Sequence, residues 1–211
     1  MDAFAHNAPT RSAALESDHR RNEILEIAKT LFKQKGYKAT TMAEIASGAN
    51  LAVGTVYKFF KDKHDLYSTL VAETMAEFES AAIQALRDTP GDETARIQRY
   101  LLRGAELFAK HLPLIRVYFS ETGAAFLYAA AGLENEASVA YEHIVTELTE
   151  VFRSGIERGL FIDLPPEALR RGLEGIHNAF MSVLIRDPER YTPEQIAALC
   201  GRIFFDSVRR G

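Results

Sequence analysis

Hydroxyl, aromatic and basic side chains gather within residues 41–63, and these side-chain types suit contact with nucleic acid. Thr and Tyr hydroxyls donate hydrogen bonds to phosphates or bases, and Lys supplies a cation. Val56 and Phe60 lie four residues apart, so they share an inward helical face. Gly54 carries no side chain where the backbone can approach a duplex. The side chains left on the other faces, where they can reach DNA, are Val53, Thr55, Tyr57 and Lys58.

Two short helices joined by a tight turn must position these side chains. Thr41 and Glu44 form a Thr-x-x-Glu capping box, which fixes the start of the first helix. Gly48 and Asn50 are the residue types that most readily take a positive φ, as a short turn between crossing helices requires. The second helix runs over residues 53–59. This arrangement predicts a helix-turn-helix that inserts its second helix into the major groove.

A further phosphate position is expected where the next helix begins. Asp62 suits the N-cap, so Lys63 lies at a helix N-terminus, where free N–H groups and the dipole favour a phosphate oxygen. Lys61 adds positive charge nearby. For each single lysine, the alternative is a solvated loop, because charged surface loops are common.

Residues 20–70 resemble the TetR family of bacterial one-component transcriptional regulators. The resemblance rests on residues 24–32 with the Gly36-Tyr37 pair after them, and on residues 40–46, 54–57 and 60–66. It implies a three-helix DNA-binding head. The matching phosphate-contacting positions are Thr41, Tyr57 and Lys63, and the base-reading positions are Val53, Gly54, Thr55 and Lys58.

Two positions depart from the family pattern. Asn50 stands where the family usually has Gly, an exchange that the left-handed tendency of Asn tolerates. Phe59 stands where the family often has His or Tyr, so we expect Phe59 to pack rather than to bond phosphate.

The net charge of −4 is unevenly distributed along the chain. Residues 18–63 contain nine Lys and Arg against five acidic residues, whereas residues 64–211 contain fifteen against twenty-two. A basic head on an acidic body fits a protein that contacts nucleic acid at one end.

Cys200 is the only cysteine, which excludes an intramolecular disulfide and a multi-cysteine metal site and fits a reducing cytoplasm. Its spacing to Ile196 and Ile203 favours inert packing over redox sensing.

Residues 1–17 lack an apolar run, which predicts a disordered arm rather than a signal segment. The uncharged apolar stretch over residues 122–133 is too short to span a bilayer. We therefore expect a cytoplasmic protein without a membrane partner.

The remainder of the chain is helical by its apolar period, which predicts an all-α protein. The helix that starts at Asp62 continues until the break at residues 89–91. With the resemblance, this implies a helix-turn-helix domain over residues 18–66 and a helical effector-binding and dimerisation domain over residues 67–211. The later helices are expected at residues 92–110, from Pro113 onward, and at residues 135–158, 167–186 and 192–209, the last with a second capping box at Thr192 and Gln195.

The last two helices carry more apolar residues than one inward face needs. In the resembling family two such helices from each chain form a four-helix dimer bundle, which implies a homodimer on a two-fold symmetric operator in double-stranded DNA. The alternative is that these residues only fill the core of one chain. The expected interface residues are Phe180, Leu184, Phe204 and Phe205.

Aromatic and polar residues among the apolar helices of the body suit the wall of a ligand cavity. For each of them, ordinary core packing is the alternative. The wall chemistry and the resemblance together predict a small apolar or amphipathic effector that releases a repressor from its operator. The expected effector-binding residues are Phe108, His111, Tyr118, Phe119, Phe126, Tyr128, Tyr141 and His177.

Enzyme motifs with the required spacing are lacking, and we expect neither catalytic residues nor a cofactor. Glu174 and His177 have the Glu-x-x-His spacing of di-iron helical bundles, but none of His64, His111 and His143 has Glu three residues before it. We therefore expect no metal site. The alternatives are a helical metalloenzyme and a ligand-binding bundle without DNA function.

Overall fold

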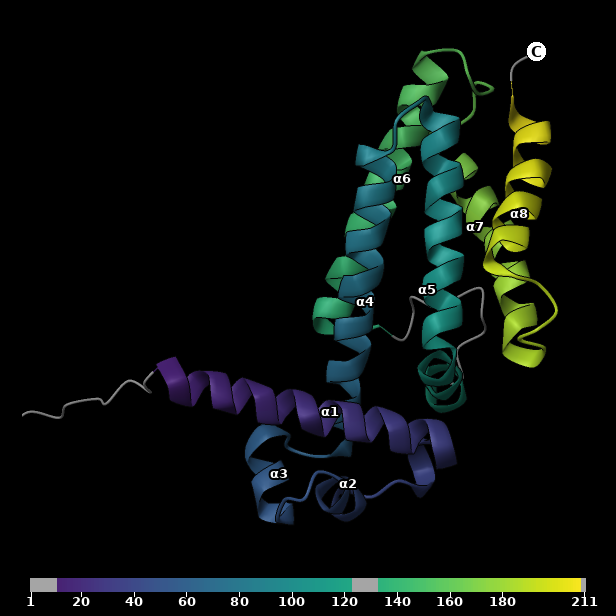
Figure 1. The fold of residues 1–211 in the computed structure, drawn as a ribbon. Helices are drawn as coiled ribbons and strands as arrows, with labels where there is room; N and C mark the ends of the chain where they lie inside the picture. The colour runs from purple at the N-terminus through teal and green to yellow at the C-terminus, as the bar shows by residue number, and fades with distance from the viewer. Residues whose placement is uncertain (1–10, 123–132, 210–211) are drawn as a thin grey trace, which may run out of the picture. The chain divides into compact units, whose positions relative to one another are not determined.

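The computed structural model describes residues 11–122 and 133–209, and over these ranges the chain forms eight α-helices (Figure 1). The single extended pairing among the described residues is an isolated antiparallel bridge between Phe161 and Arg209. The predicted all-α fold is therefore confirmed. The chain divides into two compact units, Met1–Leu70 and Val71–Gly211, and helix α4 (Lys63–Asp88) contributes to both.

The first unit consists of three helices and the first turns of α4. Helix α1 (Arg11–Ala39) packs on α2 (Met42–Gly48), which packs on α3 (Val53–Phe59). Because α1 begins at Arg11, residues 11–17 are helical, and the arm expected over residues 1–17 was predicted too long. The core of this unit is formed by Ile24, Leu25, Ala28, Phe32, Ile45, Val56, Phe60 and Leu66.

Local sequence signals position α2 and α3. The Thr41 hydroxyl accepts the Glu44 N–H, and the Glu44 carboxylate accepts the Thr41 N–H, so the predicted capping box is confirmed. Asn50 has the expected positive φ of 54°. Gly48 is instead helical, and glycine is needed there because a Cβ would lie 2.7 Å from the Ile27 Cγ2 atom. The prediction of a positive φ at Gly48 was therefore wrong.

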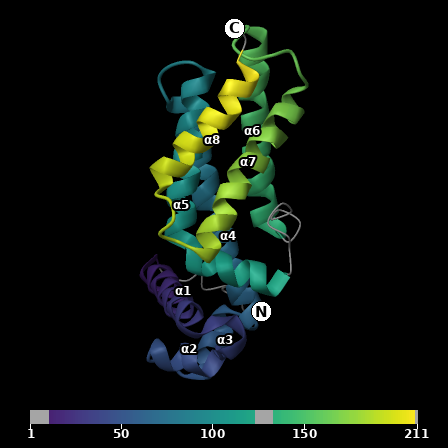
Figure 2. The ribbon, with the colours of Figure 1, turned by 90° about the vertical axis from the view of Figure 1, so that its right-hand side faces the viewer.

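The second unit is a helical bundle built from the rest of α4 and from four further helices (Figure 2). Helix α8 packs on α5 and α7, and α6 packs on the same two helices. The Asp92 carboxylate accepts the Ala95 N–H and caps the first of the four. These helices are α5 (Glu93–Thr122), α6 (Asn135–Glu157), α7 (Pro166–Arg186) and α8 (Pro193–Val208).

Helix α5 differs from the prediction at Pro113, which lies inside one continuous helix rather than at the start of a second one. Proline removes a backbone donor and normally interrupts a helix. Here the neighbours Leu112 and Leu114 are buried in the second unit, and burial of apolar side chains stabilises the helix through the proline. The predicted break was therefore wrong because tertiary packing overrides the local preference.

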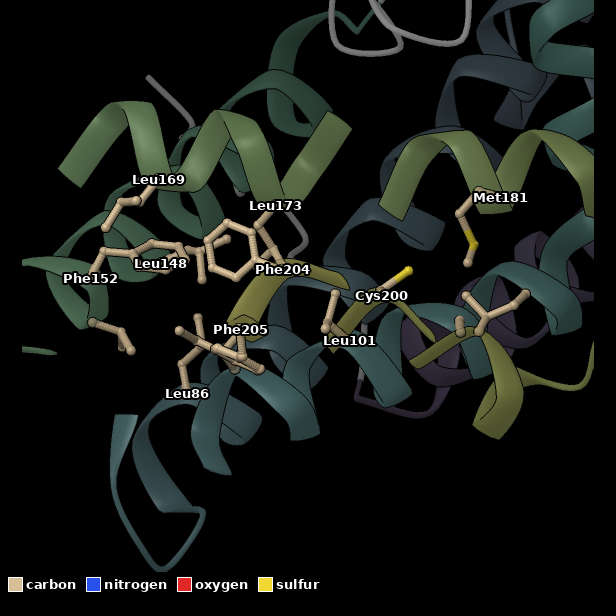
Figure 3. Close-up of a cluster of buried hydrophobic side chains, with 14 of the residues drawn as sticks. Leu86, Leu101, Leu148, Phe152, Leu169, Leu173, Met181, Cys200, Phe204 and Phe205 are labelled. Atoms are coloured by element: carbon tan, nitrogen blue, oxygen red, sulfur yellow. The ribbon is translucent and has the colours of Figure 1, made fainter. Parts of the chain in front are cut away.

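Aromatic side chains of α8 fill the centre of the second unit (Figure 3). Leu184, Phe204 and Phe205 are 1%, 3% and 2% exposed in the single chain, and the Phe204 ring lies 5.6 Å from that of Phe152. The expectation that these three residues form the dimer interface is therefore wrong, because the chain's own core already covers them. Phe180 is partly buried, with its ring 5.9 Å from that of Tyr191.

Candidate nucleic-acid interface and ligand cavity

Helix α3 presents a sharply divided surface. Val56 and Phe60 are buried, which confirms the inward face expected from their spacing. Tyr57 and Val53 are 52% and 39% exposed, although large apolar and aromatic side chains are usually covered. Among the predicted base-reading and phosphate positions of α3, Val53, Gly54, Tyr57 and Lys58 are exposed, and Thr55 is half-buried.

Thr41 uses its donors within the protein. Its N–H and its hydroxyl both donate to the Glu44 carboxylate, at 2.9 and 2.8 Å. The Lys35 ammonium, followed by these Thr41 donors, lowers the pKa of Glu44 to about 2, so the carboxylate stays ionised at neutral pH. Thr41 is exposed, and the phosphate contact expected of it stays a prediction that requires rearrangement of these bonds.

Lys63 points into the protein rather than toward solvent. Its ammonium donates to the carbonyl oxygens of Tyr37 at 2.7 Å and Thr40 at 2.8 Å, with that of Lys38 at 3.4 Å, and it lies 4.3 Å from the Tyr37 ring centroid. An ammonium has three N–H donors, and all three have carbonyl partners here. In this structure the geometry therefore does not support the phosphate contact predicted for Lys63. The N-cap predicted at Asp62 is confirmed by a 2.8 Å bond from the Asp65 N–H.

The second unit contains a cavity of about 220 Å³ between helices α4, α5, α6 and α7. This volume is below the range of about 300–1,000 Å³ that is common for drug-sized ligands, which favours a small occupant. Most of the wall is apolar. Helix α4 contributes six of the lining residues, which are Val71, Thr74, Met75, Phe78, Ala81 and Ala82.

The predicted effector-binding residues divide into three groups. Five line the cavity: Phe108, Tyr118, Phe119, Tyr141 and His177. Two, Phe126 and Tyr128, lie outside the described residues.

His111 is the remaining predicted residue, and it does not line the cavity. It is 5% exposed, and its Nε2 atom is bonded to the Glu77 carboxylate at 2.7 Å. His111 thus joins α5 to α4 and does not face the ligand cavity. The structure therefore does not support the effector role predicted for His111, because this side chain contacts Glu77 of α4 rather than the cavity.

Part of the cavity wall is polar. Tyr100 from α5, Tyr141 from α6, and His177 and Asn178 from α7 contribute polar groups to the lining. None of these four side chains has a hydrogen-bond partner in the described part of the chain, and the His177 Nε2 atom is buried. Burial lowers the pKa of His177 to about 4, so its imidazole is neutral at pH 7. Unpaired polar groups in an apolar cavity are the arrangement that orients a ligand.

Sequence reasoning missed Tyr100 and Asn178. Tyr100, Gly104 and Phe108 are spaced by four residues on α5, a stripe that could have indicated a shared face. Glycine at position 104 makes room for the imidazole, because a Cβ there would lie 3.3 Å from the His177 Cε1 atom. This close approach joins two helices and leaves no local trace in the sequence.

The Glu-x-x-His pair of α7 is arranged differently from a pair of metal ligands. The Glu174 carboxylate accepts a hydrogen bond from the buried Arg170, while His177 lies against α5. Within residues 11–122 and 133–209, no cluster of three potential metal ligands occurs.

No helix in this part of the chain combines the length and apolar character needed to cross a membrane.

Comparisons with known proteins agree with this geometry. Residues 24–70 match the family described as "Bacterial regulatory proteins, tetR family". Over 100 residues, the chain is 35% identical to the "Uncharacterized HTH-type transcriptional regulator YhgD" of Bacillus subtilis, a match that covers 47% of this chain and 51% of that protein. It is 30% identical over 96 residues to the "HTH-type transcriptional regulator AcrR" of Shigella flexneri, covering 46% and 45%.

The chain thus spans about half the length of the curated relatives that it matches. Similarity of fold extends further. A crystal structure of a TetR/AcrR-family transcriptional regulator from Thermobifida fusca aligns over 91% of this chain and 100% of its own, with a TM-score of 0.73 and 21% identity. The family and the named relatives are regulators rather than enzymes, in agreement with the expectation from the sequence.

Proposed function

Through residues 24–70 the chain belongs to the tetR family of bacterial regulatory proteins, and we propose that it is a homodimeric repressor that a small, mainly apolar effector releases from DNA. The observation that carries this proposal is the exposed surface of α3. Tyr57, Val53 and Lys58 project from a helix that Val56 and Phe60 anchor in the core. A rigid helix with exposed hydroxyl, apolar and basic groups suits insertion into the major groove.

Each group on α3 has a distinct role in the proposed complex. The Tyr57 hydroxyl donates to a phosphate oxygen, and Lys58 reads a base edge or neutralises the backbone. Val53 and Thr55 offer methyl groups to thymine. Gly54 has no protein atom within 4 Å of where a Cβ would lie, so its missing side chain leaves room for the duplex rather than for another helix.

The proposed dimer uses α7 and α8, but through residues other than Leu184, Phe204 and Phe205, which the core of the single chain covers. Ile203 is a large apolar side chain on α8 that is 47% exposed in the single chain. Leu199 lies one turn before it and is half-buried, as are Ile176 and Val183 on α7. Two copies of this face would place two heads on a two-fold symmetric DNA site.

Effector release is proposed to act through α4. This one helix provides the N-terminal turns next to α3 in the sequence and six residues of the cavity wall. Its 26 residues span about 39 Å at 1.5 Å per residue, so a small tilt at one end becomes a larger displacement at the other. A ligand that prefers the tilted arrangement shifts the population away from the DNA-binding state.

Selection of bound sequences from a random duplex library tests the DNA part of the proposal. The expected result is a sequence with two-fold symmetry, bound by two chains per site. Enrichment of no sequence, or of an asymmetric site bound by one chain, would contradict it. Tyr57→Phe retains the ring and removes the hydroxyl, and it should weaken binding to every selected sequence by a similar factor. Tyr191→Phe, on a residue of the second unit, is the matched control.

The release step is tested with 1-decanol as a probe for the cavity. Titration of the selected duplex, with and without 1-decanol, should show weaker DNA binding when the alcohol is present. Tyr118→Ala removes an aromatic ring from the wall and enlarges the cavity. It should reduce this response, while DNA binding without the alcohol stays near its original value. If the Tyr118→Ala protein loses DNA binding equally when no alcohol is present, Tyr118 is a core residue instead.

A further inference from the structure

We infer that the cavity selects an uncharged amphipathic ligand over an anionic one of equal length, with the ligand's polar group held by Tyr100, Tyr141 and His177. This inference rests on the proposed effector role of the cavity and specifies the chemical class of the effector. It is carried by the polar residues of the cavity wall and by the Arg170–Glu174 ion pair on α7, the helix that supplies two of them.

The composition of the wall argues against a charged occupant. The residues that line the cavity, as far as the structure describes them, include no Lys, Arg, Asp or Glu. His177 is neutral at pH 7, so it does not supply a cation. Removing an ionised carboxylate from water costs several kcal/mol unless a buried partner compensates. The described residues of the wall offer no such partner to an anion.

The same wall suits a neutral polar group. The Tyr100 and Tyr141 hydroxyls and the Asn178 amide can both donate and accept hydrogen bonds, and so can a neutral imidazole as a whole. None of them is hydrogen-bonded to another described residue. A ligand hydroxyl, carbonyl or amide would satisfy groups that are costly to leave unpaired away from water. These side chains come from α5, α6 and α7, so one small polar group can contact several helices.

The Glu174 carboxylate on α7 disfavours an anion beside Tyr100 and Tyr141. Glu174 lies three residues before His177 and four before Asn178, and therefore on the same helical face. Its partner Arg170 is 6% exposed and donates to it through Nη1. Burial and then the Glu174 charge raise the pKa of Tyr100 and of Tyr141, and at both residues the opposing effect of Arg170 is smaller. The Glu174 charge thus acts more strongly on the two tyrosine hydroxyls than the Arg170 charge does.

Three probes of equal chain length test the inference on the full chain by isothermal titration at pH 7: 1-decanol, decanoate and decylammonium, each below its aggregation concentration. We expect 1-decanol to bind at least about tenfold more tightly than decanoate, which corresponds to about 1.4 kcal/mol. Equal or tighter binding of decanoate would overturn the inference while leaving the effector cavity intact. Tightest binding of decylammonium would also overturn it.

If none of the three probes binds, the cavity is not a ligand site. The effector part of the proposed function then fails together with this inference. The DNA part does not depend on the result, because the duplex selection tests it separately. These outcomes therefore distinguish failure of the ligand class from failure of the cavity.

A charge substitution on α7 provides an independent test. Glu174→Gln removes the negative charge and leaves the Arg170 cation without its counter-ion, so decanoate binding should strengthen about tenfold while 1-decanol binding changes less than about threefold. Glu167→Gln removes the same charge from an exposed position on the same helix and should change neither. An unchanged decanoate affinity in a folded Glu174→Gln protein would contradict the role of the ion pair.

Discussion

The Lys63 ammonium donates a 2.7 Å hydrogen bond to the backbone carbonyl oxygen of Tyr37. The Thr40 carbonyl accepts from the same ammonium, and the Tyr37 ring lies beside it. Tyr37 directly follows Gly36, whose φ of 81° ends the helical conformation of α1. Carbonyl groups near this residue are therefore left without intrahelical partners. Lys63 thus joins the end of α1 to the beginning of α4, as a capping residue would.

Lys63→Ala should therefore lower the free energy of unfolding by about 1–2 kcal/mol, because carbonyls at the end of α1 lose a charged donor. Urea denaturation measures this effect. The salt dependence of DNA binding should stay unchanged. Lys61→Ala, at an exposed neighbouring position, is the control and should leave stability unaltered. A salt slope lower by about one unit per head, with unchanged stability, would instead show a phosphate contact.

Gly54→Ala should stabilise the protein slightly and weaken DNA binding. A Cβ at this position meets no protein atom, and alanine in a helix is favoured over glycine by roughly 0.5–1 kcal/mol. The added methyl group would occupy space proposed for the duplex, so we expect at least about a tenfold loss of affinity in fluorescence anisotropy.

Gly48→Ala provides the contrast to Gly54→Ala. Its Cβ would lie 2.7 Å from Ile27, so this variant should lose thermal stability. Unchanged DNA affinity in a folded Gly54→Ala protein would remove α3 from the proposed interface at this position.

Ile203→Glu should convert the proposed dimer to a folded monomer, because it places an unpaired charge in the interface at a cost of several kcal/mol. Sedimentation or light scattering at micromolar concentration measures the change. Phe205→Glu should instead unfold the chain, since Phe205 is 2% exposed within its own core. A monomeric wild-type protein would contradict the proposed dimer, and a dimeric Ile203→Glu protein would contradict this interface.

His177 should make stability depend on pH. Burial lowers its folded pKa to about 4 from the ordinary value of 6.5, so the unfolded chain binds more protons between these two values. The contribution is present in full above about pH 6.5 and is lost as pH falls toward 4. This pH-dependent part of the unfolding free energy amounts to about 3 kcal/mol.

Urea denaturation at pH 7 and pH 5 should show a smaller decrease in unfolding free energy for His177→Asn than for the wild type. His143→Asn is the control, because His143 is 62% exposed and pairs with Glu79 at the surface. If the His177→Asn protein loses as much stability as the wild type between these pH values, the imidazole is not buried in neutral form.

The sequence by itself determined the elements whose causes are local. The capping boxes at Thr41 and Thr192, the N-cap at Asp62 and the positive φ at Asn50 each depend on residues within a few positions of one another. The inward face of α3 followed from the spacing of Val56 and Phe60 in the same way. Apolar periodicity likewise indicated the later helices, because helical geometry repeats over short distances.

Only the tertiary structure decided which helices supply the partners of each side chain. Lys63 is directed to carbonyls 23 to 26 residues away, and His111 pairs with a carboxylate 34 residues away. Phe205 is covered by the core of its own chain rather than by a second copy. A periodic pattern shows that a face must be buried, but the burying surface comes from helices remote in sequence. The packing of those helices therefore assigns each buried group to core, cavity or interface.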